Sequence, residues 1–419
     1  MHPIQAIPYV PGRAQGPLRL GTPTASGTIA LARGAEVPRL AGQPAGLLVV
    51  DAAPLSHGMI RLFRAGIPTL LLSRAQAETL EEGEELVLDG DRGWLGPAAA
   101  APPALAQPPP PQAGQPVTTA DGIAVSLRAS VADSAGAAQA LAQGAAAIGL
   151  VRSELLMPAS GAAPDADFYQ TALAALYQAA APLTLTLRLI DLAGDKLPAW
   201  LPPEPGAFTA LGLQGSRLYD REPVRSVLLA QLEAITRLAP RHPLALIIPF
   251  VVGPRDFTRW RDELAPHLPP STAFGAMAET PAAVLALPEL LAAADLVAIG
   301  CNDLSQCLFA ADRDLPEVAP YLDPYAPALF RFLASAAQAA GPDLERVMLC
   351  GLLPQLPGLL PVLVGLGYRA VSVEPLLIPR LAQGLRRLTA PRALELAARV
   401  CAAGDGAEVR QILALPSGA

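Results

Sequence analysis

Lysine is almost absent from this chain of 419 residues: Lys196 is the only one, so arginine supplies nearly all of the 30 basic side chains. Acidic residues number 37, and the formal net charge is −7. A protein that binds nucleic acid without sequence preference normally carries a basic excess, so this balance argues against that class. Aromatic residues are also few, at 5%, but hydrophobic residues reach 52%. The composition therefore indicates a globular core built mainly from Ala, Leu and Val.

Long apolar runs are missing as well. No segment offers the roughly 18 unbroken apolar residues of a membrane span, because three prolines interrupt the most apolar stretch, residues 351–367. The N-terminus has neither the basic start nor the apolar core of a signal peptide. The four cysteines are too few and too widely spaced for a disulfide framework or a zinc site. We therefore expect a cytoplasmic protein without membrane insertion.

A proline-rich run divides the chain. Residues 101–116 read APPALAQPPPPQAGQP, a composition that favours a stiff, extended spacer and excludes a helix or a central strand. The sequence predicts a small α/β domain at 1–100, a linker at 101–117, a larger domain at 118–400 and a C-terminal tail at 401–419. Strand-like runs at 45–51, 69–72 and 85–88 support a sheet in the small domain.

The larger domain alternates strand-like apolar runs with amphipathic stretches of helical length. The expected helices cover 132–145, 167–180, 223–238, 281–294 and 326–340. The expected strands cover 123–127, 147–151, 183–190, 244–250, 273–278, 296–300, 346–350 and 369–373. Eight such repeats predict an α/β fold with an eight-stranded β/α (TIM) barrel, and a doubly wound open sheet is the alternative.

Polar residues recur where these strands end. In a β/α barrel the catalytic side chains stand at the C-terminal ends of the strands. Arginines are found there at Arg152 and Arg188, and the other residues in such positions are Glu279, Asn302, Asp303 and Cys350. Each alone could be a capping or surface residue, but their repetition predicts a polar site at the mouth of the barrel.

The residue types at this mouth favour phosphate chemistry. Arg152, Arg188 and Arg313 offer guanidinium forks that fit phosphate and carboxylate oxygens. Glu279 and Asp303 offer hard oxygen ligands for Mg²⁺. We therefore expect phosphoryl transfer from a small anionic substrate, a reaction that depends on positioning and charge neutralisation. Cys350 would be a proton donor or a nucleophile, or else simply a small buried hydrophobe.

In the small domain, His57 stands at a strand-to-helix junction. The amides at a helix N-terminus favour an anion, so a phosphorylated imidazole would be stabilised there. The alternative is an ordinary histidine at the start of a helix.

Several ordered motifs now resemble one family, the phosphoenolpyruvate-utilising enzymes, above all enzyme I of the bacterial sugar phosphotransferase system. SHGMI at 56–60 and GIP at 66–68 resemble the phosphohistidine signature of its swivelling domain. Six further segments of the chain resemble, in order, the barrel motifs of the family. They are GLVRSELL at 149–156, RLIDLAGDK at 188–196, AMAETPAAV at 276–284, IGCNDLSQ at 299–306, ADRD at 311–314 and LCG at 349–351.

The resemblance implies a role for each matching residue. His57 would accept the phosphoryl group of phosphoenolpyruvate, and Cys350 would protonate the enolate to give pyruvate. Glu279 and Asp303 would bind Mg²⁺. The substrate-binding residues would be Arg152, Arg188, Arg217, Asn302, Asp303 and Arg313. The resemblance also implies a homodimer and, as acceptor, a phosphocarrier protein.

The chain departs from the family pattern near the histidine and in the barrel. A hydroxyl residue expected two positions before His57 is Leu55, and an arginine expected six positions after it is Phe63. In LGLQGSR at 211–217, Gln214 replaces one arginine and Arg217 remains. At residues 21–42 we do not expect the helical domain that docks the carrier HPr in this family, and we do not expect an ATP-binding domain within these 419 residues.

Three functions are consistent with the sequence. The first is a phosphotransferase that works through phosphorylated His57 and an unidentified acceptor. The second is a non-catalytic regulator that binds phosphoenolpyruvate or pyruvate, suggested by the altered surroundings of the histidine. The third is carbon–carbon bond chemistry on pyruvate, which the attached SHGMI domain disfavours.

Overall fold

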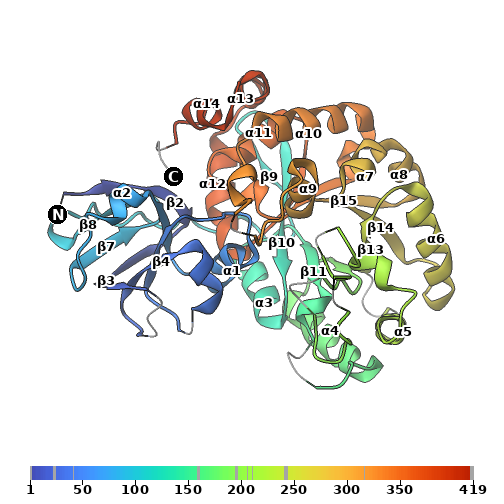
Figure 1. Cartoon of the computed structure of the whole chain (residues 1–419). Helices are drawn as coiled ribbons and strands as arrows, with labels where there is room; N and C mark the ends of the chain where they lie inside the picture. The colour runs from blue at the N-terminus through green and yellow to red at the C-terminus, as the bar shows by residue number, and fades with distance from the viewer. Residues whose placement is uncertain are drawn as a thin grey trace.

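A computed structural model of the chain describes residues 2–21, 25–40, 42–157, 161–193, 197–204, 206–209, 211–239, 244–315 and 317–415. Two sheets organise it, one in the N-terminal part and one in the C-terminal part (Figure 1). Helix α1 (His57–Ala65) lies where the two parts meet.

The N-terminal sheet has eight strands in the order β1-β8-β7-β3-β4-β5-β6-β2. Strands β3 to β6 pair parallel to one another, and antiparallel strands flank them on both sides. The strands are β1 (Ile4–Gln5), β2 (Ile7–Val10), β3 (Arg13–Leu20), β4 (Ile29–Arg33), β5 (Gly46–Val50), β6 (Thr69–Leu72), β7 (Glu85–Asp89) and β8 (Trp94–Pro97). The runs expected at 45–51, 69–72 and 85–88 correspond to β5, β6 and β7.

Local sequence explains both ends of α1. The Ser56 side chain accepts a hydrogen bond from the backbone N–H of Met59 and caps the N-terminus, and Gly66 ends the helix with a φ of 64°. Met59, Leu62 and Phe63 are buried, a helical spacing that leaves the opposite face to solvent. This geometry puts His57 at the first position of the helix, on the side of the small domain that meets the barrel.

The proline-rich spacer has no helix or strand between residues 101 and 116. At its start, Arg13 and Arg92 of the small domain donate hydrogen bonds to the carbonyls of Pro102 and Pro103. At its end, the backbone N–H of Gly114 donates to Ala145 O at 2.9 Å. The spacer is thus fixed to the small domain at one end and to the barrel at the other.

Strands β10 to β17 run parallel and form a closed barrel, because β10 pairs with both β11 and β17. The predicted TIM barrel is confirmed, and the open sheet is excluded. The strands are β10 (Ala124–Val131), β11 (Ile148–Arg152), β12 (Leu185–Arg188), β13 (Leu244–Val251), β14 (Ala273–Ala278), β15 (Leu296–Gly300), β16 (Val347–Cys350) and β17 (Ala370–Val373). The short strand β9 (Val117–Thr118) pairs antiparallel with β10.

Helices pack around this barrel (Figure 1). They are α3 (Ser134–Ala142), α4 (Ala166–Ala180), α5 (Val224–Leu238), α6 (Pro254–Leu264), α7 (Pro281–Leu285), α8 (Leu287–Ala293), α9 (Cys301–Phe309), α10 (Pro327–Ala340), α11 (Leu359–Gly365), α12 (Ile378–Arg387), α13 (Ala390–Ala402) and α14 (Gly406–Ile412). A short helix, α2 (Arg74–Ala77), belongs to the small domain. The single helix expected at 281–294 is wrong: it is two helices, α7 and α8. Helix α13 also crosses the expected domain limit at residue 400.

Two interdomain ion pairs lie beside α1 and near the C-terminal helices. Arg64 pairs with Asp133 at 2.9 Å, and Arg380 of α12 pairs with Asp91 of the small domain. The contacts of His57 add a third connection, described below.

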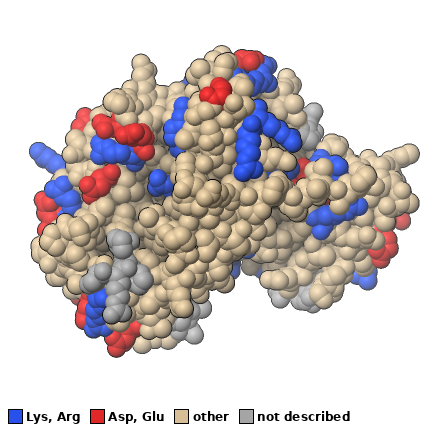
Figure 2. Space-filling view, turned by 180° about the vertical axis from the view of Figure 1, so that it is seen from behind, with Lys and Arg blue, Asp and Glu red and all other residues tan. Residues whose placement is uncertain are grey.

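None of the helices in the described part of the chain is long and apolar enough to cross a bilayer. In Figure 2 the charged atoms form small groups separated by wide uncharged areas, as the 16% charged content suggests.

Candidate active site

The site residues continue the inward-facing register of the barrel strands. Leu150, Met277, Met348 and Cys350 belong to the hydrophobic cluster inside the barrel. Because side chains on a strand alternate between two faces, the residue two positions further on also faces inward. The pairs are Leu150 and Arg152, Met277 and Glu279, and Met348 and Cys350. The strands therefore deliver two charged groups and a thiol to one end of the barrel.

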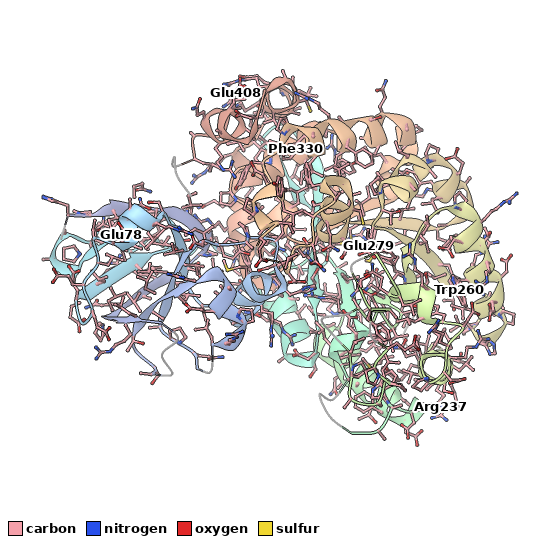
Figure 3. All side chains as sticks on the ribbon, viewed as in Figure 1. Glu78, Arg237, Trp260, Glu279, Phe330 and Glu408 are labelled. Carbon is pink, nitrogen blue, oxygen red and sulfur yellow. The ribbon has the colours of Figure 1, made fainter. Side chains whose placement is uncertain are left out.

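A cavity of about 70 Å³ opens at this end. It is lined by most of the residues that the sequence singled out: His57, Arg152, Arg188, Glu279, Asn302, Asp303, Arg313 and Cys350. An adjoining cavity of about 280 Å³ shares His57, Asp303 and Arg313 with it. Figure 3 shows Glu279 inside the barrel, whereas Arg237 lies at its periphery. The predicted residues thus meet at one place, although they come from two domains.

Arg188, the last residue of β12, is held by buried carboxylates. Its guanidinium lies 2.5 Å from Glu154 and 2.7 Å from Asp191, and it lies 4.0 Å from Glu279. Burial would lower the pKa of Arg188, but the carboxylates, foremost Asp191 and Glu154, raise it above its ordinary value. The arginine is therefore permanently charged and fixed in position.

Arg152 approaches the same cavity from β11. Its Nη2 donates to Glu374 at 3.4 Å, and Glu374 follows the end of β17. Burial raises the pKa of Glu374, and the Arg152 charge opposes that shift. The Nε groups of Arg152 and Arg188 are buried, and neither has a hydrogen-bond partner among the described residues. A buried cationic donor without a partner is costly, so both groups favour an anionic ligand in the cavity.

Glu279, directly after β14, and Asp303, in the first turn of α9 after the neighbouring strand β15, bring two carboxylates to the cavity. Glu279 accepts a hydrogen bond from the Phe250 backbone N–H and packs against Gly300, where a Cβ would lie 2.4 Å from its Oε1. Burial first, and then the charges of Asp303 and Asp191, raise the pKa of Glu279 well above its usual value. These crowded negative charges favour a nearby cation.

The two carboxylates fit Mg²⁺, which is usually held by one or two protein carboxylates together with substrate phosphate and water. Within the described ranges, no three His, Cys, Asp or Glu side chains are grouped so that they could hold a metal ion by themselves. The donor set therefore suits a metal that shares its coordination with an anionic substrate.

Cys350 ends β16 and is 2% exposed. Its Sγ lies 3.4 Å from the carbonyl oxygen of Ile299. Burial, followed by the negative charge of Glu279, raises the pKa of Cys350 to about 12, so the thiol keeps its proton at neutral pH. A protonated thiol is a poor nucleophile but can donate a proton, so the role of proton donor is favoured over that of nucleophile.

Asn302 lies in the first turn of α9, and its Oδ1 accepts a hydrogen bond from the Leu352 backbone N–H at 2.9 Å. Gly351 allows this approach, because it has a φ of 97° and a Cβ there would lie 2.8 Å from Asn302 Oδ1. The glycine of the LCG motif therefore keeps the amide beside the cysteine.

His57 reaches the cavity from the small domain and contacts two barrel side chains. Its Nδ1 lies 2.6 Å from Asp314 Oδ2, and its Nε2 lies 2.8 Å from Arg313 Nη2. The same Arg313 nitrogen lies 3.1 Å from Asp303 Oδ1. Arg313 thus bridges the histidine and one of the two candidate metal ligands. This arrangement brings the imidazole directly to the mouth of the barrel.

Arg217 is not among the residues that line either cavity. Its guanidinium stacks over the Phe250 ring at 4.9 Å and donates to the carbonyls of Leu211 and Gly212. Gln214, which stands where the family has an arginine, is buried and lines the adjoining cavity. The substrate-binding role of Arg217 stays a prediction. The last three residues of the motif at 188–196 lie outside the described residues.

Sequence reasoning missed four acidic residues at the site: Glu154, Asp191, Asp314 and Glu374. The first three lie inside motifs that were identified, and Glu374 directly follows the last strand. The rule that polar residues gather after barrel strands would have indicated Glu374. Phe63 was discussed as a replacement near the imidazole, but it is buried in the core of the small domain, with its ring centroid 4.7 Å from that of Tyr9.

Comparisons with known proteins identify a family and relatives of this chain. A family model described as PEP-utilising enzyme, PEP-binding domain matches residues 111–390. The chain is 32% identical over 397 residues to the multiphosphoryl transfer protein of Xanthomonas campestris pv. campestris, covering 89% of this chain and 46% of that protein. It is 30% identical over 374 residues to the phosphoenolpyruvate-protein phosphotransferase of Streptomyces coelicolor, covering 87% of this chain and 66% of that protein. The chain thus spans from about half to just under two thirds of the length of these relatives.

Proposed function

The chain belongs to the family of PEP-utilising enzymes, and from this premise we propose that it transfers the phosphoryl group of phosphoenolpyruvate to His57 and then to an acceptor, releasing pyruvate. The observation that carries this proposal is the meeting of His57 with a cavity that holds three arginines, three carboxylates and a protonated thiol. The names of the relatives, phosphoenolpyruvate-protein phosphotransferase and multiphosphoryl transfer protein, support the same reaction.

In the proposed reaction the arginines bind the substrate. Arg152 and Arg188 bring cationic donors to the cavity, and their buried Nε groups would donate to its carboxylate or phosphate oxygens. Asn302, beside Gly351, would add a neutral contact to the phosphoryl group. Glu279 and Asp303 would hold Mg²⁺, which when bound supplies positive charge against the phosphate oxygens.

The phosphoryl transfer itself forms one bond and breaks one. His57 Nε2 would attack phosphorus, the bond between phosphorus and the enol oxygen would break, and its electron pair would leave with the enolate. Arg313 Nη2 contacts Nε2 at 2.8 Å in this structure. As the N–P bond forms, this hydrogen bond would pass from Nε2 to a phosphoryl oxygen, so Arg313 would stay with the phosphoryl group on the histidine. A cation in that place stabilises the charge spread over the phosphoryl oxygens.

Cys350 would complete the reaction by giving its proton to the enolate carbon, which yields pyruvate. Its raised pKa keeps that proton available at neutral pH. A regulator that only bound the substrate would have no use for such a donor, so the cysteine favours the enzyme over the regulatory alternative.

The proposal is tested by incubating the protein with Mg²⁺ and phosphoenolpyruvate carrying ³²P, and then measuring acid-labile label on the chain. We expect label on the wild type and on His267→Ala, and none on His57→Ala. His267 is a suitable control because it lies in a short 3₁₀ turn after α6, away from the cavity. Saturable binding of phosphoenolpyruvate without any label would refute the transfer and support the regulator.

The acceptor belongs to the proposal as well. We expect a phosphocarrier protein, on the strength of the relatives' names, and loss of label from the chain when the true acceptor is added. A homodimer and a cytoplasmic location are also proposed. Analytical ultracentrifugation and cell fractionation test them, and a monomer or a membrane-bound pool would contradict them.

A further inference from the structure

Asp314 binds His57 at two points. Its Oδ2 lies 2.6 Å from the ring Nδ1, and its Oδ1 accepts a hydrogen bond from the His57 backbone N–H at 3.0 Å. The two residues are 257 positions apart and belong to different domains. We propose that Asp314 is a positioning residue that fixes the tautomer and orientation of the His57 imidazole, and that it does so only while the small domain is docked on the barrel. This inference rests on the proposed function of His57.

The donors around the ring select one tautomer. A guanidinium has only N–H donors, so Nε2 must accept where it meets Arg313. An ionised carboxylate only accepts, so Nδ1 must carry the hydrogen where it meets Asp314. Both contacts are satisfied by a neutral imidazole with its proton on Nδ1. That tautomer leaves the lone pair on Nε2, the nitrogen that faces the cavity.

The backbone contact adds orientation. His57 is the first residue of α1, and its N–H is one of the donors that a helix leaves without an intrahelical partner. The Asp314 carboxylate accepts from it and lies at the positive end of the helix dipole. Asp314 is therefore anchored to the helix and to the ring together, and this double contact fixes how the imidazole enters the cavity.

Asp314 is itself held firmly on the barrel side. Its backbone N–H donates to Asp312 Oδ1 at 2.9 Å, and the preceding Arg313 N–H donates to Gln306 Oε1 at 3.0 Å. Burial works to raise the pKa of Asp314, but the hydrogen bonds from His57 and the charge of Arg313 lower it below its usual value. The carboxylate is therefore ionised at neutral pH, as the ring contact requires.

During transfer Asp314 would keep the proton of Nδ1 in place without taking it. When Nε2 forms its bond to phosphorus, the imidazole becomes cationic while Nδ1 keeps its hydrogen. The carboxylate next to Nδ1–H stabilises that positive charge, and the electron pair of the broken bond leaves with the enolate. An aspartate in this role orients and stabilises an imidazole without becoming protonated.

This assignment accounts for a departure in the small domain. Leu55 stands where the family has a hydroxyl residue, and it is 3% exposed in the domain core. The ring partners at Nδ1 and Nε2 come instead from the barrel loop that follows α9. The histidine would then acquire its reactive tautomer at the place where the phosphoryl donor is bound.

The direct test is nuclear magnetic resonance of the full chain labelled with ¹⁵N-histidine, without substrate. His57 is assigned by comparison with His57→Ala. We expect a protonated, pyrrole-type Nδ1 and an unprotonated, pyridine-type Nε2 in the wild type. In Asp314→Asn we expect the two ¹⁵N shifts to move towards a mixture of tautomers, while the other histidines keep their shifts. Wild-type shifts in Asp314→Asn would overturn the proposal.

The matched control is Asp133→Asn. Asp133 pairs with Arg64 of α1 at 2.9 Å, so its substitution removes the same charge from the same interdomain contact without touching the His57 ring. It also caps α3, and asparagine caps equally well. We expect the His57 shifts to be unchanged in this variant. An equal change in both variants would mean that Asp314 only helps the domains to dock.

The kinetic test measures the rate of acid-labile ³²P labelling. We expect Asp314→Asn to slow labelling by roughly 10- to 100-fold, the usual loss when a residue that orients an active group is changed. Asp314→Glu should recover part of the rate, and Asp133→Asn should retain it. If the wild type itself is not labelled, the proposed function fails, while the resonance experiment still decides the role of Asp314.

Discussion

Arg188→Met removes the charge on which the buried part of the site depends. The Arg188 side chain is 6% exposed, and those of Glu154 and Asp191 are 1% and 11% exposed. Without the guanidinium, both buried carboxylates lose the cation that they share. Removing one partner of a buried ion pair typically costs about 3–5 kcal/mol of unfolding free energy.

Urea unfolding measures this loss. In a Trp94→Phe background, the fluorescence of Trp200 and Trp260 reports on the barrel, where Trp260 is 2% exposed. With a slope of about 3 kcal/mol per molar urea, the expected loss lowers the unfolding midpoint by roughly 1–1.7 M. Adding Glu154→Gln to Arg188→Met should restore part of the midpoint, because one of the two buried carboxylates is then neutral.

The control is the same substitution at an exposed ion pair. Arg237 pairs with Asp167 and Glu233 on the surface, and its side chain is 40% exposed. Exposed pairs contribute about 0–1 kcal/mol, so Arg237→Met should shift the midpoint little. If Arg188→Met shifts it no more than Arg237→Met, the reasoning about buried charge at this site is refuted.

Three further changes have defined outcomes. Cys350→Ser should slow pyruvate release by about 10²-fold or more, as expected for a lost proton donor, in an assay coupled to lactate dehydrogenase; an unchanged rate would exclude the thiol as donor. The lowered pKa of Asp314 means that its stabilisation is present above the ordinary aspartate pKa and lost as the pH falls through the lowered one. The difference in urea midpoint between wild type and Asp314→Asn should therefore shrink between pH 7 and about pH 3, and a constant difference would contradict this. Gly351→Ala should cost about 1–3 kcal/mol of stability, because its φ is 97° and its Cβ would meet Asn302; a neutral effect would show that the Asn302 amide is free to move.

Much of the barrel could be predicted from the sequence, because local residue patterns determine its strands and helices. Arg152 and Cys350 end their strands and Glu279 directly follows β14, and the alternation of side chains along a strand sends all three inward. The break between α7 and α8 was also within reach of the sequence. Pro288 lacks an N–H and clashes with the carbonyl four residues earlier, so a single helix could not continue through it.

The partners of these residues were harder to predict, because they depend on closure of the barrel and on docking of the small domain. Glu374 meets Arg152 only because β17 returns to β10 and completes the barrel. Asp314 meets His57 only where the two domains touch. No local pattern connects residues so far apart along the chain, which is why the sequence indicated the histidine but not the carboxylate beside it.

The proline-rich spacer is fixed at both ends, so it limits the distance that His57 can move from the barrel. Between Pro103, which is bound to the small domain, and Pro111, which packs against Gly144 of the barrel, roughly seven residues are left to act as a tether. Such a length spans at most about 25 Å. A tether this short keeps the two domains at an effective concentration of the order of millimolar. Weak docking therefore suffices to return the imidazole to the barrel. An acceptor has to approach His57 within the distance that the tether allows.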